Sequence, residues 1–443
     1  MTDDLHHRFP LIDERGRRLL LRLEEHPRAP RYTHRGFNRL TPAGLRRAAD
    51  FAAALDSSPP RWEHERPPDW LAEFVAHCFR HVPLYRRWGP PPPRFTDLPT
   101  TDRSDLNREP WSFVPDTQPL DDLIIYNTSG VTGHPLSILT HPDTLALYIP
   151  LLRAALAARN VALEGGPDRI AIALVCDQKQ TYTYAAVMPA LDQAGFVKLN
   201  LNPAEWREAG DRAKFLDDLD PEIYTGDPIS FAELARLPIT ARPKALVSTA
   251  MVLTPGLRAQ LETRFDCPAL DLYSMNESGP IAVAAPTGDR WIPLQPRLYI
   301  EILDPDGAPT PPGARGEIVL SGGFNPFLPL LRYRTGDHAA LEIIGGQPAL
   351  IGLEGRAPVV FRAADGRPLN NIDISIALRP LAIAQFNLHQ FADGSLRLRW
   401  RSAGAEESEV REALLAHFGA TQALLIESVN AFEGKALNYT SDL

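Results

Sequence analysis

Apolar and polar positions follow two rhythms along the chain: short apolar runs, and longer stretches with an apolar residue every three or four positions. The short runs predict strands at 123–125, 169–175, 196–201, 222–225, 245–248 and 270–273. The longer stretches predict helices at 40–55, 145–158, 183–194, 228–237 and 255–265. Thr41 is a suitable N-cap for the first helix. Strands that alternate with helices in this way are typical of a parallel sheet covered by helices on both faces.

A different pattern begins near residue 291. Segments at 299–303, 317–320 and 339–343, separated by glycines, predict a β-rich subdomain. Strands at 359–362, 395–401 and 423–426 and a helix at 406–418 predict a small α+β unit at the end. We therefore expect an α/β protein whose large domain has helix-covered, mostly parallel sheets. The expected boundaries are 1–66 for an arginine- and proline-rich N-terminal extension, 67–354 for the large domain and 355–443 for the small domain.

Composition narrows the class of protein. A length of 443 residues favours two domains, and 44% apolar with 23% charged residues is typical of a soluble globular protein. The net charge of −9 argues against nucleic-acid binding. Cys78, Cys176 and Cys267 lie too far apart for a zinc site or a disulfide framework, so we expect three buried thiols. Because the sequence shows no membrane span and no signal peptide, we expect a cytoplasmic protein without a membrane partner.

A loop rich in glycines and hydroxyl groups follows the strand at 123–125. It reads Thr-Ser-Gly-Val-Thr-Gly-His-Pro at 128–135. Gly130 and Gly133 allow the backbone to approach a ligand closely, because neither carries a Cβ. Thr128, Ser129 and Thr132 add hydroxyl donors to the backbone N–H groups, which suits an oligophosphate. A surface turn is the alternative interpretation of such a loop taken alone.

Further motifs follow this loop in a fixed order. They are Tyr-Ser-Met-Asn-Glu-Ser-Gly-Pro at 273–280, Leu-Arg-Tyr-Arg-Thr-Gly-Asp at 331–337, Gly-Arg at 355–356 and Gly-Lys at 434–435. The ordered set resembles the adenylate-forming superfamily of acyl-CoA synthetases, peptide-synthetase adenylation domains and luciferases. His-Val-Pro-Leu-Tyr-Arg-Arg at 81–87, Leu-Pro-Thr-Thr at 98–101 and Phe-Leu-Pro-Leu at 327–330 resemble its phenylacetate–CoA ligase branch. The resemblance runs from about residue 67 to the C-terminus.

The resemblance implies a binding site for ATP and Mg²⁺. The loop at 128–134, His134 included, would hold the outer phosphates, and Tyr273 and Ser274 would lie beside the adenine. Asp337 would accept hydrogen bonds from both ribose hydroxyls, since a carboxylate offers two acceptor oxygens. Arg334 and Arg356 would lie near the ribose and phosphates.

Two residues carry the implied catalysis. Glu277 resembles the family's magnesium ligand, and a lone carboxylate suits a cation that takes its other oxygens from water and nucleotide. Lys435 resembles the lysine that the small, mobile C-terminal domain swings in to bridge the carboxylate and the α-phosphate. Such positioning and charge neutralisation bring two anions together.

The acid would be selected by two segments. Tyr182 and Tyr184 can flank a planar ring, which favours an aryl or aryl-like carboxylic acid. Ala250 and Met251 belong to the second segment. Packing on a helix face is the alternative interpretation of the two tyrosines.

The chain departs from the family's pattern at three places. His134 replaces a lysine of the phosphate loop, and Ala357-Pro358 replaces the usual acidic hinge after Gly355-Arg356. Thr249-Ala250-Met251 replaces Gly-Ala-Glu. Because proline fixes φ, the hinge at Pro358 would be stiffer than in the family.

The expected function is therefore ATP-dependent activation of a carboxylic acid as an acyl-adenylate, with release of pyrophosphate. The acyl group would then pass to a thiol of CoA, or to the phosphopantetheine of a carrier protein. Two alternatives stay open: transfer to an amine or another non-thiol nucleophile, and a degenerate nucleotide-binding homologue. By likeness to the phenylacetate branch, a homodimer is also expected.

Overall fold

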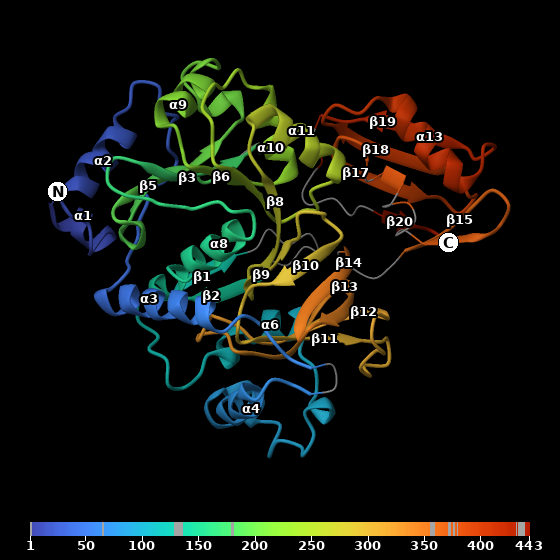
Figure 1. Ribbon diagram of the computed structural model, residues 1–443, viewed down its shortest axis with the longest axis horizontal. Coiled ribbons are helices and arrows are strands. Elements are labelled where there is room, and N and C mark those ends of the chain that lie inside the picture. Colours follow the sequence, from blue (N-terminus) through green and yellow to red (C-terminus); the bar gives the residue numbers. More distant parts are fainter. Residues whose placement is uncertain are drawn as a thin grey trace.

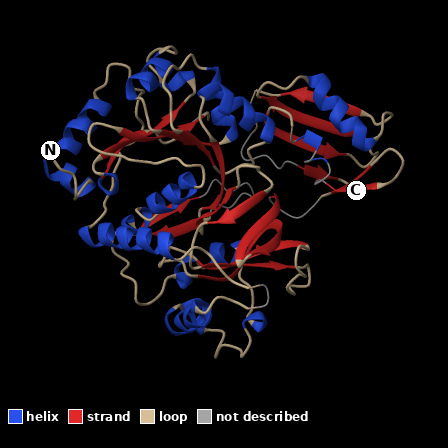
Figure 2. Ribbon diagram, viewed as in Figure 1, coloured by secondary structure: helices blue, strands red, loops and turns tan. Residues whose placement is uncertain are grey.

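The computed structural model describes residues 2–63, 66–127, 136–178, 181–354, 359–370, 374, 377–378, 380–430, 432 and 439–443. In this part of the chain a twelve-stranded sheet runs through the centre of the molecule (Figure 2). In spatial order its strands are β11 (Leu298–Leu303), β12 (Arg315–Gly322), β13 (Leu330–Ile344), β14 (Gln347–Glu354), β10 (Arg290–Pro293), β9 (Gly279–Ala284), β8 (Ala269–Met275), β7 (Ala245–Ser248), β6 (Ile223–Gly226), β3 (Ile170–Cys176), β5 (Ala194–Asn200) and β4 (Tyr184–Met188).

The middle of this sheet is parallel and both of its ends are antiparallel. Strands β5, β3, β6, β7 and β8 pair in parallel, whereas β4 and the strands beyond β8 pair antiparallel. The five strands expected between residues 169 and 273 all form. The expected α/β class, with a β-rich part and a small C-terminal α+β unit, is confirmed.

The helix expected at 183–194 is wrong, because this segment forms strand β4 and a tight return into β5. Tyr184 pairs with Lys198 and Met188 pairs with Ala194. Aromatic and β-branched residues favour a strand here. Pro189 begins a 3-10 turn, and Asp192 and Gln193 close the hairpin with φ of 50° and 64°.

Helices cover both faces of the parallel strands (Figure 1). On one face lie α1 (Thr2–Arg8), α2 (Glu14–Glu24), α9 (Asp211–Leu219), α10 (Pro228–Arg236) and α11 (Pro255–Phe265). On the other lies α8 (Tyr148–Ala157). Helix α3 (Pro42–Ser57) contacts both α8 and the short helix α7 (Pro142–Leu145). The helix expected at 145–158 forms as α8, and the short helix α7 precedes it. Helix α3 begins after the expected Thr41 N-cap, which accepts a hydrogen bond from Gly44 N.

The first residues of the chain are part of the main core. Leu19, Leu20 and Leu23 of α2 are buried against Val187 of β4 and Val197 of β5. Gly195 leaves room for this contact, because a Cβ there would lie 3.3 Å from Leu23 Cδ1.

The β-rich part carries its own short elements. They are α4 (Trp70–His81), α5 (Pro83–Arg86), α6 (Arg103–Arg108), η1 (Phe95–Asp97), η2 (Pro110–Phe113) and a hairpin of β1 (Ile124–Asn127) and β2 (Ser137–Thr140). Two further 3-10 turns are η3 (Pro189–Leu191) and η4 (Pro203–Glu205).

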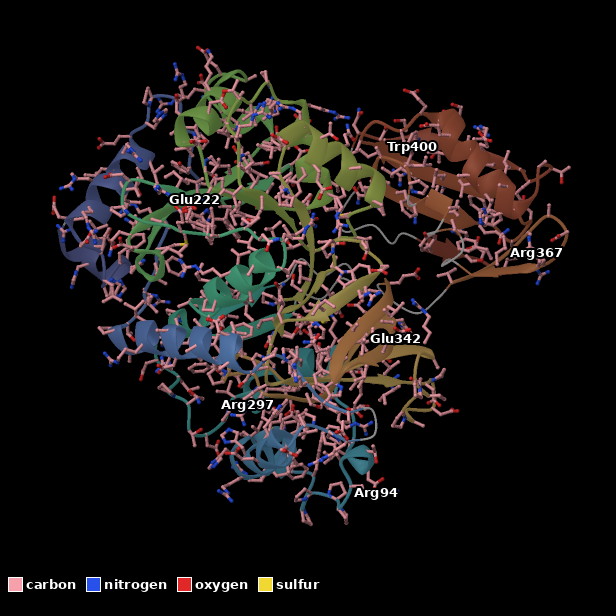
Figure 3. The ribbon with its side chains drawn as sticks, in the orientation of Figure 1. Arg94, Glu222, Arg297, Glu342, Arg367 and Trp400 are labelled. Atoms are coloured by element: carbon pink, nitrogen blue, oxygen red, sulfur yellow. The ribbon has the colours of Figure 1, made fainter. Side chains whose placement is uncertain are left out.

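The C-terminal unit is a second, smaller α+β layer. Its sheet has the order β19 (Leu424–Ser428), β18 (Leu396–Ser402), β17 (Ile383–Gln390), β20 (Tyr439–Ser441). A hairpin of β15 (Val360–Arg362) and β16 (Pro368–Asn370) adjoins it, and α13 (Glu407–Phe418) covers one face. Trp400, 3% exposed, lies in this small core (Figure 3).

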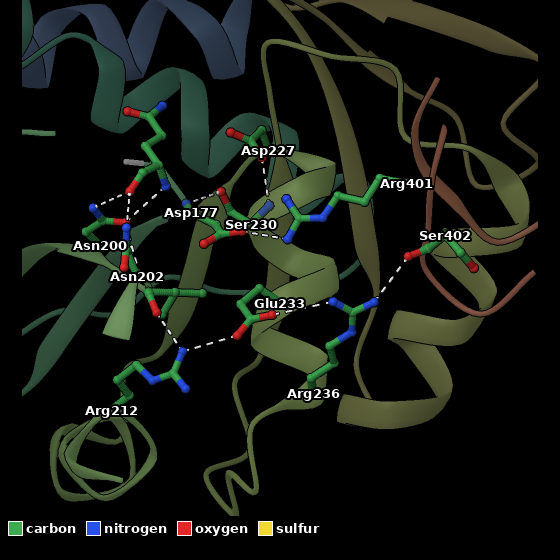
Figure 4. A network of polar contacts seen from close by, with 12 residues as sticks. Asp177, Asn200, Asn202, Arg212, Asp227, Ser230, Glu233, Arg236, Arg401 and Ser402 are labelled. Atoms are coloured by element: carbon green, nitrogen blue, oxygen red, sulfur yellow. Dashed lines mark hydrogen bonds and ion pairs between the residues drawn. The ribbon is translucent and has the colours of Figure 1, made fainter. Parts of the chain in front are cut away.

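The C-terminal unit rests on α10 and α11 of the large part. Arg401 Nη2 lies 2.6 Å from Asp177 Oδ2, and Arg236 Nη2 donates to Ser402 O at 3.3 Å (Figure 4). Thr254 Oγ1 donates to Leu381 O at 3.3 Å. Gly256 is needed here, since a Cβ at that position would lie 2.4 Å from Pro380 O.

Candidate active site

Two motifs that are far apart in the sequence meet where β8 passes into β9. Tyr273, near the end of β8, donates its hydroxyl hydrogen to Asp337 Oδ2 of β13 at 2.8 Å. Tyr333, four residues before Asp337, donates to Glu277 Oε1 at 3.1 Å. Each motif therefore supplies one tyrosine and one carboxylate, and each tyrosine binds the carboxylate of the other motif.

Glu277 is a buried carboxylate, with 4% of its surface exposed. Besides Tyr333, it has Arg103 of α6 near it, with 3.7 Å between Arg103 Nη1 and Glu277 Oε1. A carboxyl group at this depth needs such partners, because it is removed from water. Across the described ranges, no three His, Cys, Asp or Glu side chains gather as a metal site. A cation at Glu277 would take its remaining oxygens from water and a bound ligand.

Asp337 is held by the short run that precedes it. Its backbone N–H donates to Thr335 Oγ1 at 3.0 Å, and that hydroxyl donates to Ile318 O at 2.8 Å. Glu317 of β12 accepts from Gly336 N at 3.0 Å and from Arg334 Nε at 2.8 Å. Gly336 has a φ of +78°, which favours glycine. Arg334 therefore pairs with Glu317 and helps to fix this turn.

Both tyrosines remain hydrogen-bond donors over the usual pH range. Burial raises the pKa of Tyr273 well above its ordinary value, and the nearby Asp337 carboxylate raises it further. The pKa of Tyr333 is raised in the same way, by burial first and then by Glu277. The two phenols therefore keep the protons with which they orient the two carboxylates.

The segments at 81–87, 98–101 and 327–330, which resemble the phenylacetate–CoA ligase branch, support this site from behind. Tyr85 is fully buried, donates to Pro329 O at 3.0 Å and accepts from Leu331 N at 3.0 Å. The backbone of Thr101 makes two hydrogen bonds to β13. Its carbonyl oxygen accepts from Arg334 N at 2.7 Å, and its N–H donates to Arg332 O at 3.0 Å. These contacts fix the start of the strand that carries Tyr333 and Asp337.

The structure also shows where Ser274 and the two tyrosines of the predicted acid-binding segment lie. Ser274 pairs with Pro280 in the β8–β9 ladder, one residue after Tyr273. Tyr182 is 63% exposed, with the His34 ring 4.2 Å away between centroids and Lys198 Nζ 5.9 Å from its ring centre. Tyr184 is half-buried on β4, 5.8 Å from the Phe196 ring.

The two predicted acid-binding segments belong to strands that are not neighbours in the sheet. Ala250 and Met251 follow β7, whereas Tyr184 lies on β4, and strands β6, β3 and β5 stand between them. Four steps of about 4.8 Å separate the two strands by about 19 Å. Ala250 also has a φ of +68°, a strained value for a residue with a Cβ.

The remaining predicted residues lie outside the described part of the chain. They are Thr128, Ser129, Gly130, Thr132, Gly133, His134, Arg356 and Lys435. Among described residues, Tyr333, Arg103, Glu317 and Thr335 are additions to the predicted site. Their nearness to Asp337 in the chain would have identified Thr335 and Tyr333. Nothing in the sequence pointed to Arg103.

The three cysteines are buried as expected, and no described helix is long and apolar enough to cross a membrane.

Known proteins similar to this chain were found by sequence and by structure. No model of a known protein family matches the chain. It is 27% identical to a phenylacetate-coenzyme A ligase of Escherichia coli (strain K12) over 291 residues, which cover 59% of this chain and 63% of that protein. It is 25% identical to a phenylacetate-coenzyme A ligase of Pseudomonas putida over 353 residues, 73% of this chain and 77% of that protein. The chain thus spans less than two thirds of the first relative.

The fold is that of a solved acyl-CoA ligase. A 2-hydroxyisobutyryl-CoA ligase, in the postadenylation state and in complex with R3-HIB-AMP, matches with a TM-score of 0.63 at 17% identity. The match covers 84% of this chain and 88% of that chain. An open conformation of the same ligase, in complex with 2-HIB-AMP and CoA, matches with a TM-score of 0.52 over 83% of this chain and 89% of that one.

Proposed function

We propose that this chain, a member of the adenylate-forming superfamily similar to its phenylacetate–CoA ligase branch, activates a carboxylic acid with ATP as an acyl-adenylate. Pyrophosphate is released, and the acyl group then passes to the thiol of CoA. The observation that supports this most is the pair of contacts Tyr273–Asp337 and Tyr333–Glu277. They bring two of the ordered motifs into one site.

The residues present fit a nucleotide with its magnesium ion. Asp337 would receive the ribose hydroxyls, with the turn at Thr335 and Gly336 holding its backbone. Glu277 would hold Mg²⁺ with one carboxylate, which is enough for a cation that shares oxygens with nucleotide and water. Mg²⁺ supplies charge neutralisation of the phosphates when it is bound. Tyr273 and Ser274 would lie beside the adenine.

Chemically, the site has to bring two anions together. A carboxylate oxygen of the acid bonds to the α-phosphorus while the bond to pyrophosphate breaks. Residues at 128–134, Arg356 and Lys435 would supply the phosphate contacts and the mobile cation, in line with the resemblance. Arg334 pairs with the Glu317 carboxylate. It would therefore stabilise the turn at Thr335 and Gly336 that holds Asp337, rather than contact the phosphates.

The finer parts of the proposal concern the acid and the domains. We propose an aryl or aryl-like acid, with Tyr184 or the segment at Ala250 and Met251 forming its wall. We keep 67–354 as the large domain and 355–443 as the small mobile one. Buried residues between Phe9 and Ala29 pack in the same core as β4 and β5, so this part of the N-terminal extension supports the Tyr184 strand.

The test is acid-dependent exchange of pyrophosphate into ATP, run with a panel of aryl, heteroaryl and aliphatic acids. We expect exchange with an aryl acid, and a loss of about 100-fold in Glu277→Gln, since removal of one charge-stabilising group costs about that much. Glu342→Gln is the matched control, because Glu342 is an exposed glutamate of β13 at the edge of the β-rich part (Figure 3).

Two results would contradict the proposal. Tight ATP binding without exchange for any acid would identify a degenerate nucleotide-binding homologue. Exchange followed by transfer to an amine, with no CoA thioester among the products, would assign a different acceptor.

A further inference from the structure

Lys198 of strand β5 is a half-buried cation without a carboxylate partner among the described residues. The structure describes three lysines, of which Lys214 is exposed on α9 and Lys244 lies 2.7 Å from Glu222 Oε2. Lys198 forms no ion pair and donates no hydrogen bond within the described part of the chain, and its Nζ lies 5.9 Å from the exposed Tyr182 ring. A half-buried ammonium group in this position is suited to an anion, because burial removes part of its water.

The Cys176 thiol near Lys198 does not supply that anion. Burial raises the pKa of the thiol to about 11, although the Lys198 ammonium acts in the opposite direction, so the thiol stays neutral near pH 7. Glu205, which also acts on Cys176, accepts a hydrogen bond from Asn200 Nδ2 at 2.7 Å. No described group therefore forms an ion pair with Lys198.

Lys198 belongs to the face of the sheet that α8 covers. It pairs with Tyr184 of β4 and with Leu174 of β3, so the three side chains share one face. Ile172, two residues before Leu174 on the same side of β3, is buried in one core with Leu151 of α8. Figure 1 shows α8 and strand β1 on this side of β3 and β5.

Aromatic side chains lie between this face and the candidate active site. Tyr184, the cross-strand neighbour of Lys198, lies close to Tyr126 of β1: burial first, and then the phenols of Tyr184 and Tyr148, raise the pKa of Tyr126. Tyr148 of α8 is in turn close to Glu277, since burial and then this carboxylate raise the pKa of its phenol to about 12. Three tyrosines therefore join the surroundings of Glu277 to those of Lys198.

These side chains are accessible to a ligand. Tyr126 is 42% exposed, and Tyr148, Tyr184 and Lys198 each keep part of their surface exposed. Aromatic side chains favour flat rings, which they contact by offset stacking or edge-on. The lysine at the far end favours a negative charge, and this attraction is stronger at a half-buried position than in water.

We propose that Lys198 binds a second acidic group of the substrate, at the end remote from the carboxylate that is activated. The substrate is then an extended aromatic acid with a terminal carboxylate or sulfonate, whose rings contact Tyr126, Tyr148 and Tyr184. Strands β7, β6 and β3 stand between β8 and β5, so the two acidic groups lie far apart on the molecule. The assignment rests on the proposed function, because it narrows the class of acid that the site activates.

Calorimetric titration of the full chain with matched acids tests the proposal without requiring turnover. Each pair of acids is a diacid and its monoamide, on one ring (terephthalate) or on two (a biphenyl dicarboxylate), so only the second charge differs. We expect the diacid of suitable length to bind the unaltered protein about 10- to 100-fold more tightly than its monoamide. Lys198→Gln should remove this difference by weakening the diacid alone.

Lys198→Glu distinguishes loss of the contact from loss of the fold. It should bind the same acid with an aminomethyl group in place of the second carboxylate about 10-fold more tightly than the unaltered protein does. Misfolding cannot produce such a gain. Lys214→Gln is the matched control, because Lys214 is an exposed lysine of the same large part, and its substitution should leave both affinities unchanged.

Equal binding of every diacid and its monoamide by the unaltered protein would overturn the proposal, as would a diacid affinity that Lys198→Gln leaves unchanged. Absence of binding by every acid would overturn it as well. Pyrophosphate exchange with aryl monoacids measures the proposed function separately. Exchange with a monoacid, without any preference for a diacid, would keep acid activation and remove only the role of Lys198.

Discussion

Asp271 is a carboxyl group that the fold keeps away from water. It is 7% exposed on β8, beside Ser248 of β7 in the parallel ladder, and accepts a hydrogen bond from Leu253 N at 3.2 Å. Burial raises its pKa to about 7, although Leu253 N and the Arg258 guanidinium act in the other direction. Leu253, two residues after Met251, thus contacts a carboxyl that titrates near neutral pH.

This residue should make stability depend on pH. Its folded pKa of about 7 lies above the ordinary value of 3.8, so the folded state holds the proton more strongly than the unfolded state. Its contribution to stability is therefore largest at acid pH and is lost as the pH rises through about 7. Urea unfolding of the unaltered protein and Asp271→Asn, at pH values from about 4 to about 8, measures this.

The unaltered protein should lose stability relative to Asp271→Asn over that range. Comparison of the two proteins cancels the titration of other carboxyl groups, since both share them. A constant difference in the free energy of unfolding at every pH would show that Asp271 does not titrate as described.

At the scale of elements, the site depends on how β13 is fixed at its start. The Tyr85 hydroxyl lies between Pro329 O and Leu331 N and joins α5 to the strand that carries Tyr333 and Asp337. Both backbone groups are buried, so each needs a hydrogen-bond partner, and the Tyr85 hydroxyl supplies it. Through Tyr85, the short motif at 81–87 therefore stabilises the strand that carries the site residues.

Tyr85→Phe should cost about 2 kcal/mol in the free energy of unfolding, because it leaves two buried backbone groups without their partner. Denaturant unfolding checks this. Tyr182→Phe is the control, since Tyr182 is 63% exposed and its hydroxyl makes no hydrogen bond to any residue that the structure describes; a change below about 0.5 kcal/mol is expected there. Equal effects of the two substitutions would argue against the role assigned to Tyr85.

The sequence predicted most elements of the parallel region, because each has a strong local pattern. Strand β7 and helix α11 have the bounds that were expected. The error at β4 arose because residues 183–194 are apolar enough for either structure, and pairing with β5 decided between them. Pairing of this kind depends on distant residues, which local pattern does not report.

The site was predictable to the extent that it lies in short motifs. Asp337, Glu277 and Tyr273 were expected near one another, and the structure joins each to a tyrosine or carboxylate of the other motif. The contact of Arg103 with Glu277 spans 174 positions and has no local signal. The separation of Tyr184 from Ala250 follows from strand order, which composition and periodicity do not fix.

At the scale of the whole molecule, the C-terminal unit is tied to the large part by a partly buried ion pair. Asp177 and Arg401 have 20% and 12% of their side chains exposed, and Asp177 N also donates to Ser230 Oγ at 3.0 Å. Asp177 directly follows β3, five residues before Tyr182. Any motion of the small unit must therefore break a contact at the end of a central strand.

A double-mutant cycle with Asp177→Asn and Arg401→Gln should give a coupling free energy of about 1–2 kcal/mol, because solvent screens this pair only in part. The exposed pair Asp365–Arg367, with 68% and 59% exposed side chains, serves as the control cycle and should give less than about 0.5 kcal/mol. Equal coupling in the two cycles would mean that the Asp177–Arg401 pair does not hold the units together.

The packing of α2 against β4 and β5 also has a consequence for synthesis on the ribosome. Gln193 Nε2 donates to Leu11 O across 182 positions of the chain. At a synthesis rate of about 5–20 residues per second, about 10 to 40 s pass between the synthesis of α2 and that of the strands that cover its apolar side. During that time the growing chain carries an uncovered apolar helix, so its early folding intermediates are natural clients for chaperones.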